Sequence, residues 1–450
     1  MSNQSRREFL GSALAGAASL ALVTNNVVFA KSNSTEKLAA LGGKPVRATP
    51  FPGWPIVATN DEKAWADVLR KGEWCRLSDP QMGYVGQFEK AWAEMTGAKR
   101  CLATASGTTA LITSLNALDI GPGDEVIVPP YTFVATINAV FLQHALPIYV
   151  DTDRKTFQID AEKIEAAITP QTRCILPVHL GGNPVNLDKI LSIASKHGLR
   201  VVEDACQAHL AEWRGKKVGT HGDLGCFSFQ ASKNLNCGEG GAILGNDEVL
   251  MQHCEIFHNN GHGMTEAYTK DTVNGSNHRL TEFQGALLGA QITRVQAQAE
   301  ARTQNADYLT KMLREIPGVH PAEKYEGTTR SAYHLYMFRY DRGRFAGLDR
   351  SKFVHALNAE GVPCSSGYTP LNREPFMKAT LGSRAFKRIY SERERKEYEE
   401  RNQCPENDKL CNEEAVWFDQ TMLLGSRDDM EQIAEAVRKI QAQAENLVRA

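Results

Sequence analysis

A lysine stands between a short apolar run and a glycine-rich turn near the middle of the chain. The apolar run is Cys226–Phe229, Lys233 follows it, and the turn is Gly238–Gly241. A lysine at a strand end can face a cleft, where burial suppresses its charge. Such an amine can form a Schiff base with a carbonyl compound. A surface lysine in a hairpin turn explains the same spacing equally well.

Two further segments carry groups suited to a cofactor. Asp204 ends the run Val201–Asp204, and an acidic residue after a buried strand lies at the sheet edge where α/β folds bind ligands. A carboxylate there can keep the pyridine nitrogen of pyridoxal phosphate protonated, although a helix N-cap also explains Asp204. Ser106–Leu111 opens a helix with small residues and hydroxyls, so its free N–H groups could hold a phosphate. A capped helix start that binds nothing has the same pattern.

The elements that position these residues follow an alternating pattern. Short apolar runs are separated by segments of helical length, which predicts an α/β domain with a mostly parallel central sheet and helices on both faces. The predicted strands are Glu125–Pro129, Leu146–Val150, Cys174–Val178, Arg200–Val202, Cys226–Phe229 and Gly241–Leu244. The predicted helices are Gly86–Met95, Thr108–Leu118, Tyr131–His144, Ala161–Ile168 and Leu187–His197.

A smaller C-terminal unit follows. A long helical stretch, Leu280–Thr303, ends the alternation, and Tyr333–Tyr340 reads as a strand of a second, α+β unit. That unit ends in the helical pattern Asp428–Val448, while the charged stretch Phe386–Asn412 indicates a solvated helix or loop. The predicted organisation is an export signal at 1–30, an N-terminal arm at 31–60, a large domain at 61–300 and a small domain at 301–450.

Composition sets limits on the class of protein. The chain has 450 residues, 51 Lys and Arg against 53 Asp and Glu, and 42% hydrophobic residues. This balance excludes a collagen-like, disordered or nucleic-acid-coating chain. The ten cysteines show no dense disulfide spacing. Cys404 and Cys411 could pair in an oxidising compartment, but we favour free thiols.

The first thirty residues differ from the rest. Arg6 and Arg7 precede an uncharged stretch whose apolar core, Ala13–Val23, is shorter than the roughly 20 residues that span a membrane. The stretch ends at Ala30, in a small-residue pattern typical of a cleavage site. This segment predicts export by the twin-arginine route to the periplasm or another extracytoplasmic space, without stable membrane insertion.

In combination, these segments resemble the DegT/StrS-type family of pyridoxal-phosphate aminotransferases. The resemblance runs from about Leu38 to Val448 and rests on the ordered motifs E-D-x-x-Q-A, F-S-F-x-x-x-K and G-E-G-G. It implies the aspartate aminotransferase architecture, known as fold type I. The segments Gly367–Phe376 and Glu414–Phe418 look most like the branch that aminates keto-inositols.

The resemblance also implies roles for single residues. Lys233 resembles the lysine that forms the Schiff base and shuttles the proton, and Asp204 the carboxylate that faces the pyridine nitrogen. Gln207 corresponds to the amide beside the 3-hydroxyl of the cofactor. Phe133 takes the place of the aromatic ring that stacks on the pyridine, although a core phenylalanine fits its position too. The phosphate-binding positions are matched by Gly107, Thr108, Thr109 and Ser228.

Further implications concern the partner subunit and the substrate. The segment around Asn277 and Arg279 resembles one that crosses a dimer interface to the phosphate of the neighbouring subunit, so a homodimer with shared active sites is implied. His179 and Tyr368 match positions near the substrate, although a core histidine explains His179 nearly as well. We predict no metal site, because His258 and His262 have no third ligand nearby in the sequence.

The resemblance implies transfer of an amino group from glutamine or glutamate to a keto-sugar or to a keto-cyclitol such as scyllo-inosose. Two other functions stay open. The same cofactor supports sugar dehydration, although relatives that dehydrate usually replace the lysine by histidine. The third possibility is an exported, non-catalytic sugar-binding protein, which the intact Lys233, Asp204 and Ser228 disfavour. No nucleic-acid partner is expected.

Overall fold

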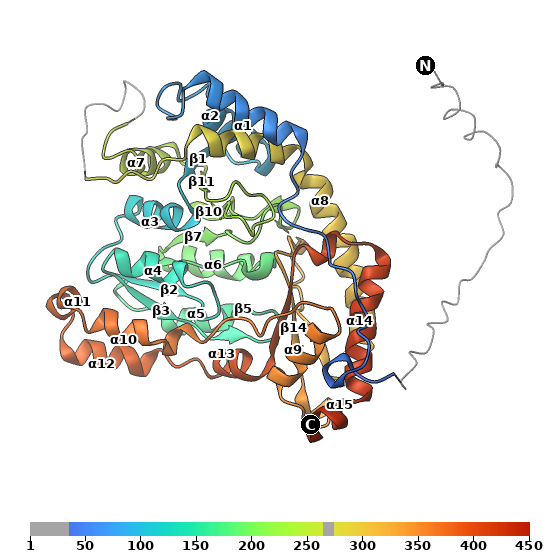
Figure 1. Ribbon diagram of the computed structural model, residues 1–450. Helices are drawn as coiled ribbons and strands as arrows, with labels where there is room; N and C mark the ends of the chain where they lie inside the picture. The colour runs from blue at the N-terminus through green and yellow to red at the C-terminus, as the bar shows by residue number, and fades with distance from the viewer. Residues whose placement is uncertain (1–35, 264–273) are drawn as a thin grey trace, which may run out of the picture.

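The computed structural model describes residues 36–263 and 274–450, and its centre is a seven-stranded sheet (Figure 1). β11 is antiparallel to both of its neighbours, β1 and β10, and all other adjacent strands are parallel. The mostly parallel α/β fold predicted from the sequence is therefore confirmed. The strands, in spatial order, are β1 (Arg100–Thr104), β11 (Gly241–Gly245), β10 (Leu224–Ser228), β7 (Arg200–Asp204), β6 (Thr172–Ile175), β2 (Glu125–Val128) and β3 (Leu146–Tyr149).

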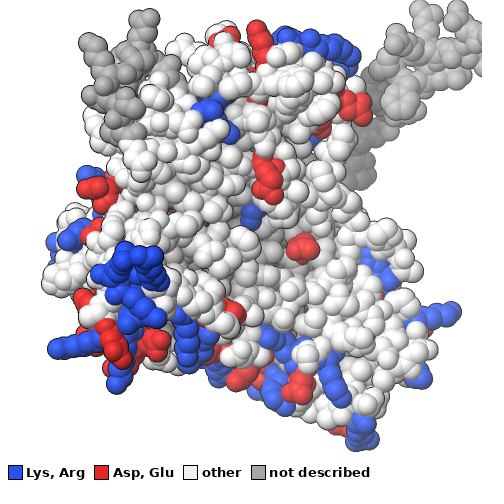
Figure 2. All heavy atoms as spheres, turned by 60° about the vertical axis from the view of Figure 1, so that its left-hand side comes forward, with Lys and Arg blue, Asp and Glu red and all other residues white. Residues whose placement is uncertain are grey.

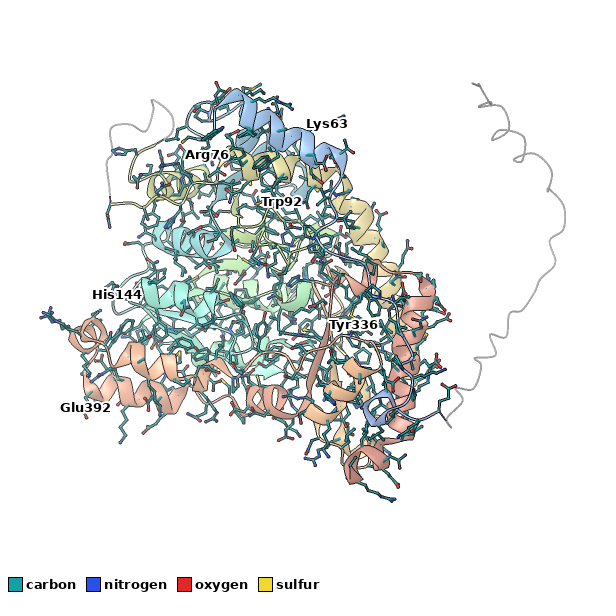
Figure 3. All side chains as sticks on the ribbon, in the orientation of Figure 1. Lys63, Arg76, Trp92, His144, Tyr336 and Glu392 are labelled. Atoms are coloured by element: carbon teal, nitrogen blue, oxygen red, sulfur yellow. The ribbon has the colours of Figure 1, made fainter. Side chains whose placement is uncertain are left out.

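Helices pack around this sheet because their apolar faces and the strands share one core. Trp92 is fully buried in that core and stacks edge-on against Phe227 and Phe229 (Figure 3). The helices of the large domain are α1 (Thr59–Lys71), α2 (Tyr84–Thr96), α3 (Gly107–Ala117), α4 (Ala135–Leu142), α5 (Ala161–Ala167), α6 (Leu187–His197) and α7 (Glu248–His258). Short strands complete it: β4 (Thr152–Asp153), β5 (Gln158–Ile159), β8 (Glu212–Trp213), β9 (Lys216–Lys217) and β13 (Thr328–Arg330).

The small domain is built on a three-stranded sheet and the end of a long helix. Helix α8 (Glu282–Arg314) continues through the predicted boundary at residue 300, so the two domains share one helix. The sheet has the order β12 (Val319–Pro321), β14 (Leu335–Tyr340) and β15 (Ala415–Asp419). The remaining helices of this domain are α9 (Arg350–Ala359), α14 (Arg427–Ala442) and α15 (Ala444–Arg449).

The domains are not contiguous in sequence. Leu38, from the predicted N-terminal arm, is fully buried in the core of the small domain. Conversely, three helices from the predicted small domain pack on the large domain. They are α10 (Pro375–Leu381), α11 (Arg384–Ile389) and α12 (Glu392–Arg401). Helix α13 (Pro405–Lys409) follows them. The linear division at residues 61–300 and 301–450 is therefore too simple.

The charged stretch covers an edge strand. β3 is the last strand of the large sheet, and the Tyr398 hydroxyl donates to the carbonyl of Pro147 in β3 at 2.7 Å. The backbone N–H of Tyr149 donates to Asn402 Oδ1 at 2.6 Å. Charged side chains gather on the lower lobe in Figure 2, where α11 and α12 lie, while Tyr398 is the buried residue of α12. The predicted solvated helix is therefore confirmed as α12, and its buried side covers β3, the edge strand of the large sheet.

Several predicted features can be compared with the described residues. Cys404 and Cys411 are buried free thiols, as we favoured. No helix among residues 36–263 and 274–450 is long and apolar enough to cross a membrane. In the same ranges, no group of three His, Cys, Asp or Glu side chains is arranged to hold a metal ion. The predicted export signal, residues 1–30, lies outside the described residues.

Candidate active site

The carboxyl ends of three strands bring the candidate residues to one edge of the large sheet. Asp204 is the last residue of β7 and Ser228 the last residue of β10, which is parallel to β7. β1 runs in the same direction, because both β1 and β10 are antiparallel to β11, and α3 begins shortly after it at Gly107. Ligands bind at this kind of edge in α/β folds.

Asp204 is fixed by a hydrogen bond to each carboxylate oxygen. The hydroxyl of Thr136 donates to Oδ2 at 2.8 Å, and the backbone N–H of Cys206 donates to Oδ1 at 3.1 Å. The residue is only 4% exposed. Each oxygen keeps a lone pair, so the carboxylate can accept a further hydrogen bond from a protonated ring nitrogen. Thr136 was missed in the sequence, since no local pattern links it to Asp204.

Lys233 lies in the loop after β10, next to a buried histidine. Burial lowers the pKa of the Lys233 amine, and the neighbouring Cys206 and Asp204 oppose that shift. Its Nζ is 3.4 Å from Nε2 of His334. Burial, together with the positive charge of Lys233, also lowers the pKa of His334 well below its usual value. At neutral pH His334 is therefore uncharged.

The network around His334 assigns its proton. Asn234 donates through Nδ2 to the carbonyl of Ala332 at 2.8 Å, which makes its Oδ1 an acceptor. That Oδ1 lies 3.3 Å from His334 Nδ1, so Nδ1 carries the proton. Nε2 then accepts a hydrogen bond from the amine of Lys233. His334 was missed because it stands about a hundred residues from Lys233 and lies in an ordinary strand pattern.

The start of α3 leaves two backbone N–H groups free at the edge of the sheet, an arrangement that can bind an anion. The Ser106 hydroxyl caps the N–H of Thr109 at 3.1 Å, and the hydroxyl of Thr109 returns a bond to the Ser106 carbonyl. The N–H groups of Gly107 and Thr108 have no acceptor among the described residues, as expected in a first helical turn. A Cβ on Gly107 would lie 2.7 Å from that of Ser228. Glycine is therefore required for α3 to approach β10 this closely.

Gln207 connects the sheet edge to the small domain. Its Oε1 accepts from the N–H of Gly181 at 2.7 Å, and its Nε2 donates to the hydroxyl of Tyr368 at 2.9 Å. Burial raises the pKa of Tyr368 to about 12. The structure thus brings two predicted residues together, and Nε2 of Gln207 keeps one N–H for another acceptor.

Phe133 stands in the turn just before α4. Its side chain is 56% exposed, although most large apolar residues of this domain are buried. Thr136, which bonds to Asp204, follows in the first turn of α4. A core position for Phe133, the alternative weighed from the sequence, is excluded by this exposure.

His179 does not lie at the mouth of the site. It is fully buried, its Nδ1 accepts from the N–H of Val185 at 3.2 Å, and its Nε2 lies 2.9 Å from a carboxylate oxygen of Glu203. Both ring nitrogens are used inside the protein, so neither is left for a substrate. The expectation of a substrate contact at His179 is corrected to a role in fixing Glu203, the neighbour of Asp204.

The segment expected to reach a second subunit lies close to the start of α3 in its own chain. The N–H of Ala105 donates to the carbonyl of His278 at 2.7 Å. The Arg279 guanidinium donates to Asn259 at 2.7 Å within the same chain, whereas Asn277 is exposed. Of the two predicted residues, Asn277 is the one whose side chain faces outward.

Comparison with known proteins identifies the family. The sequence model that describes the DegT/DnrJ/EryC1/StrS aminotransferase family matches residues 56–438 of this chain. The chain belongs to this family. It is therefore an enzyme of the transaminase class, and aminotransferases of this family depend on pyridoxal phosphate.

Individual relatives agree with that assignment. The aminotransferase is 36% identical to the L-glutamine:2-deoxy-scyllo-inosose aminotransferase of Streptoalloteichus tenebrarius over 416 residues, which covers 90% of this chain and 97% of the relative. It is also 36% identical, over 417 residues and with the same coverage, to the L-glutamine:scyllo-inosose aminotransferase of Streptomyces griseus. The crystal structure of 3-amino-5-hydroxybenzoic acid synthase has a TM-score of 0.78, with 29% identity over 90% of this chain and 100% of that chain.

Proposed function

We propose that this aminotransferase uses pyridoxal phosphate to move an amino group from glutamine or glutamate to a keto-cyclitol of the scyllo-inosose type. One observation carries the proposal: Lys233, Asp204, Gln207 and the open turn of α3 converge on one edge of the sheet. The names of the relatives from Streptoalloteichus and Streptomyces support the keto-cyclitol and the glutamine donor. A keto-sugar is the other ketone that the family architecture accommodates.

The residues at this edge fit pyridoxal phosphate. The N–H groups of Gly107 and Thr108, with the Ser228 hydroxyl beside them, suit the phosphate at the positive end of α3. Asp204 suits the ring nitrogen, and the exposed ring of Phe133 suits a stacking contact on the pyridine face. Lys233 supplies the amine that holds the cofactor covalently.

When bound, pyridoxal phosphate supplies a ring that accepts the electrons left on the donor carbon. Once the amino donor occupies the cofactor, Lys233 Nζ would be free to act as a base. Its lowered pKa leaves a larger unprotonated fraction at neutral pH, so this amine can remove the proton from the donor carbon and return it to an adjacent atom. His334 Nε2 accepts one N–H of this amine and thereby orients it. Asp204, held by Thr136 and the N–H of Cys206, would keep the ring nitrogen protonated.

The Tyr368 hydroxyl stands where the substrate is expected. It accepts from Gln207 at 2.9 Å, and its high pKa keeps it protonated at neutral pH. Its own proton is therefore available to an oxygen of a hydroxylated ring. A cyclitol, which carries hydroxyls around the whole ring, matches such a donor.

Product analysis tests the reaction. The purified enzyme, loaded with pyridoxal phosphate, is incubated with L-glutamine and scyllo-inosose, and amino-cyclitol and keto acid are quantified. The proposal predicts equal amounts of both products. A dehydrated ring formed without keto acid would instead establish the dehydratase function. Failure of the protein to retain added cofactor would favour the sugar-binding protein.

We also propose that the enzyme is a homodimer with shared active sites. Seven of the eleven large hydrophobic side chains that are exposed in the described residues come from one short part of the chain, residues 56–82. They are Ile56, Val57, Trp65, Leu69, Trp74, Leu77 and Met82. Apolar surface of this extent is typical of an interface between subunits. Analytical ultracentrifugation should give twice the mass of the chain, and a monomer at micromolar concentration would contradict the proposal.

Export by the twin-arginine route is the proposed localisation. The paired Arg6 and Arg7 near the start of the chain support this localisation, because they match the signal of that route. The route carries folded proteins, so the cofactor can be loaded before transit. Fractionation should find the wild-type chain outside the cytoplasm and the Arg6→Lys, Arg7→Lys double variant inside it. An exported double variant would contradict this route.

A further inference from the structure

Arg302 of α8 is a buried cation without a carboxylate partner. Three arginines are buried among the described residues: Arg47, Arg76 and Arg302. Arg47 pairs with Asp429, and Arg76 pairs with Glu89 at 2.8 Å. Arg302 is 0% exposed, yet it forms no ion pair within the described part of the chain. Burial lowers the pKa of its guanidinium to about 9, and no nearby carboxylate opposes that shift.

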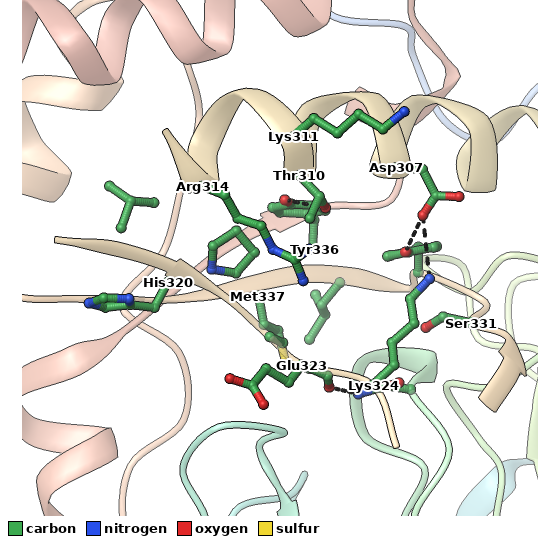
Figure 4. Close-up of a pocket in the computed structure, with 16 residues that line it drawn as sticks. Asp307, Thr310, Lys311, Arg314, His320, Glu323, Lys324, Ser331, Tyr336 and Met337 are labelled. Atoms are coloured by element: carbon green, nitrogen blue, oxygen red, sulfur yellow. Dashed lines mark hydrogen bonds and ion pairs between the residues drawn. The ribbon is translucent and has the colours of Figure 1, made fainter. Parts of the chain in front are cut away.

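Other charges on α8 lie in a different environment. Near the end of the helix a groove opens towards β12 and β14, and the charged residues that line it are exposed (Figure 4). Asp307 of this groove pairs with Lys324 at 3.4 Å. Exposed charges are solvated by water, whereas a buried charge without a partner is costly. Arg302 therefore requires a counter-ion, and the residues of the groove do not.

The hydrogen bonds of Arg302 leave two donors unused. Its Nε and Nη2 both donate to Oε1 of Gln420, the former at 2.8 Å. Its Nη1 has no acceptor among the described residues. Gln420 is 2% exposed, and because its Oε1 accepts from Arg302, its Nε2 is a donor. This Nε2 also lacks an acceptor within residues 36–263 and 274–450.

The N-terminal arm brings a third donor to this cluster. The arm runs beside α8 in Figure 1, and the guanidinium carbon of Arg302 lies 5.3 Å from the centre of the Trp54 ring. The buried Nε1 of Trp54 has no acceptor in the described ranges. Gly53 and Pro55, on either side of Trp54, are exposed, so the segment that covers Arg302 lies at the surface. Three unused donors thus surround one uncompensated charge, close beneath the surface.

A small anion has the properties that this cluster lacks. A water molecule could accept hydrogen bonds from the N–H groups, but it would leave the charge of the guanidinium uncompensated. A monovalent anion accepts the same bonds and balances one positive charge. A divalent anion such as sulfate would instead bury an excess negative charge, because Arg302 is the one cation among these three side chains.

We propose that Arg302, Gln420 and Trp54 form a buried binding site for a monovalent inorganic anion of the size of chloride. The bound anion joins three segments that are distant in sequence: the N-terminal arm, α8 and the turn after β15. This site does not depend on the proposed reaction, because none of its three residues contacts the candidate cofactor residues in the contacts described above.

The site adjoins the segment that holds the histidine next to Lys233. Gln420 follows Asp419, which pairs with Leu335 in the ladder between β14 and β15. Leu335 follows His334, whose Nε2 lies 3.4 Å from Lys233 Nζ. The anion therefore stabilises the edge of the small domain from which His334 reaches the large domain.

Urea denaturation of the purified full-length protein tests the site without turnover. The free energy of unfolding is measured in sodium chloride and in sodium gluconate at matched, rising concentrations. Gluconate is too large for a buried site, so its effect reports only the general influence of salt. Above the Kd for chloride, each tenfold rise in chloride should lower the unfolding equilibrium constant by about tenfold relative to gluconate. Equal effects of the two salts would overturn the proposal.

Two variants assign the effect to the site. Gln420→Glu places a carboxylate beside Arg302 and should abolish the difference between the salts, and it should exceed wild type in stability at low chloride. Arg302→Met removes the charge and should abolish the difference as well. Gln171→Glu is the matched control, because it adds the same charge at an exposed position, and it should keep the wild-type response. A response to chloride that persists in Gln420→Glu would contradict the proposal.

Bromide locates the anion directly in the wild-type protein. Crystals soaked in sodium bromide should show an anomalous scattering peak within hydrogen-bond distance of Arg302 Nη1. A water molecule at that position, or a carboxylate from a second copy of the chain, would overturn the anion site. None of these measurements uses the transamination assay, so their failure is distinct from failure of the proposed function.

Discussion

Glu203 offers a sharp test of how the strand that carries Asp204 is held. Its carboxylate is fully buried and accepts from the N–H groups of Gly219, His221 and Gly222 at 2.7–2.8 Å, and from His179 Nε2 at 2.9 Å. Burial alone would raise its pKa, but the hydrogen bond from His179, with the backbone donors, outweighs it and lowers the pKa to about 2.

The magnitude follows from this shift. The pKa falls from 4.5 to about 2 on folding, and each unit corresponds to about 1.4 kcal/mol, so the carboxylate contributes about 3 kcal/mol to the free energy of unfolding. The folded-state pKa is depressed, so this contribution is fully present above pH 4.5 and is lost as the pH falls towards 2. Glu203→Gln places an NH₂ group against N–H donors. The variant should therefore lose this contribution to the free energy of unfolding, because an amide cannot accept all four hydrogen bonds.

Denaturation in urea, followed by tryptophan fluorescence, measures the effect. At pH 7 the Glu203→Gln variant should be less stable than wild type by about 3 kcal/mol, and the gap should shrink as the pH approaches 3. Glu165→Gln is the control, because the pKa of Glu165 is also lowered to about 2, by His197 and Lys196, but its carboxylate is solvent-exposed. That variant should match wild type at pH 7. Equal losses in both variants, or a gap that does not depend on pH, would refute the reasoning.

Three further variants test other contacts. Phe133→Ala should retain pyridoxal phosphate less tightly by about 1 kcal/mol, because a stacking ring is removed; cofactor absorbance after dialysis measures this. Tyr368→Phe should lower kcat/KM by about tenfold, through loss of one hydrogen bond to substrate, with cofactor content unchanged. Tyr398→Phe should cost about 1 kcal/mol in urea denaturation, because the bond to Pro147 is lost from the sheet edge, while activity stays at the wild-type level.

Local signals explain which elements the sequence predicts well. Helix α6 has the predicted bounds Leu187–His197, because Asn186 caps its first turn and Gly198, at φ 66°, ends it. The helix predicted from Tyr131 begins only at Ala135, because residues 131–134 form the turn that leads to Thr136. Strand β1 was missed, because its first residue is charged and its apolar part is short.

Features that depend on distant contacts had no local signal. The helix that covers β3 bonds to residues about 250 positions earlier in the chain, so its charged sequence indicated only a solvated element. The contact between Lys233 and His334 likewise joins two domains. His179 looked like a substrate residue because its position in the motif fits either role. Only its burial against Glu203 distinguishes them.

The central claim is that Lys233 holds the cofactor. Borohydride reduction of the purified protein, loaded with pyridoxal phosphate, makes any lysine–cofactor bond permanent, and mass spectrometry of the peptides then locates it. The account predicts one label per chain, on Lys233, and none in Lys233→Ala. A label on another lysine, such as Lys216 or Lys217 in β9, or no label at all, would contradict it.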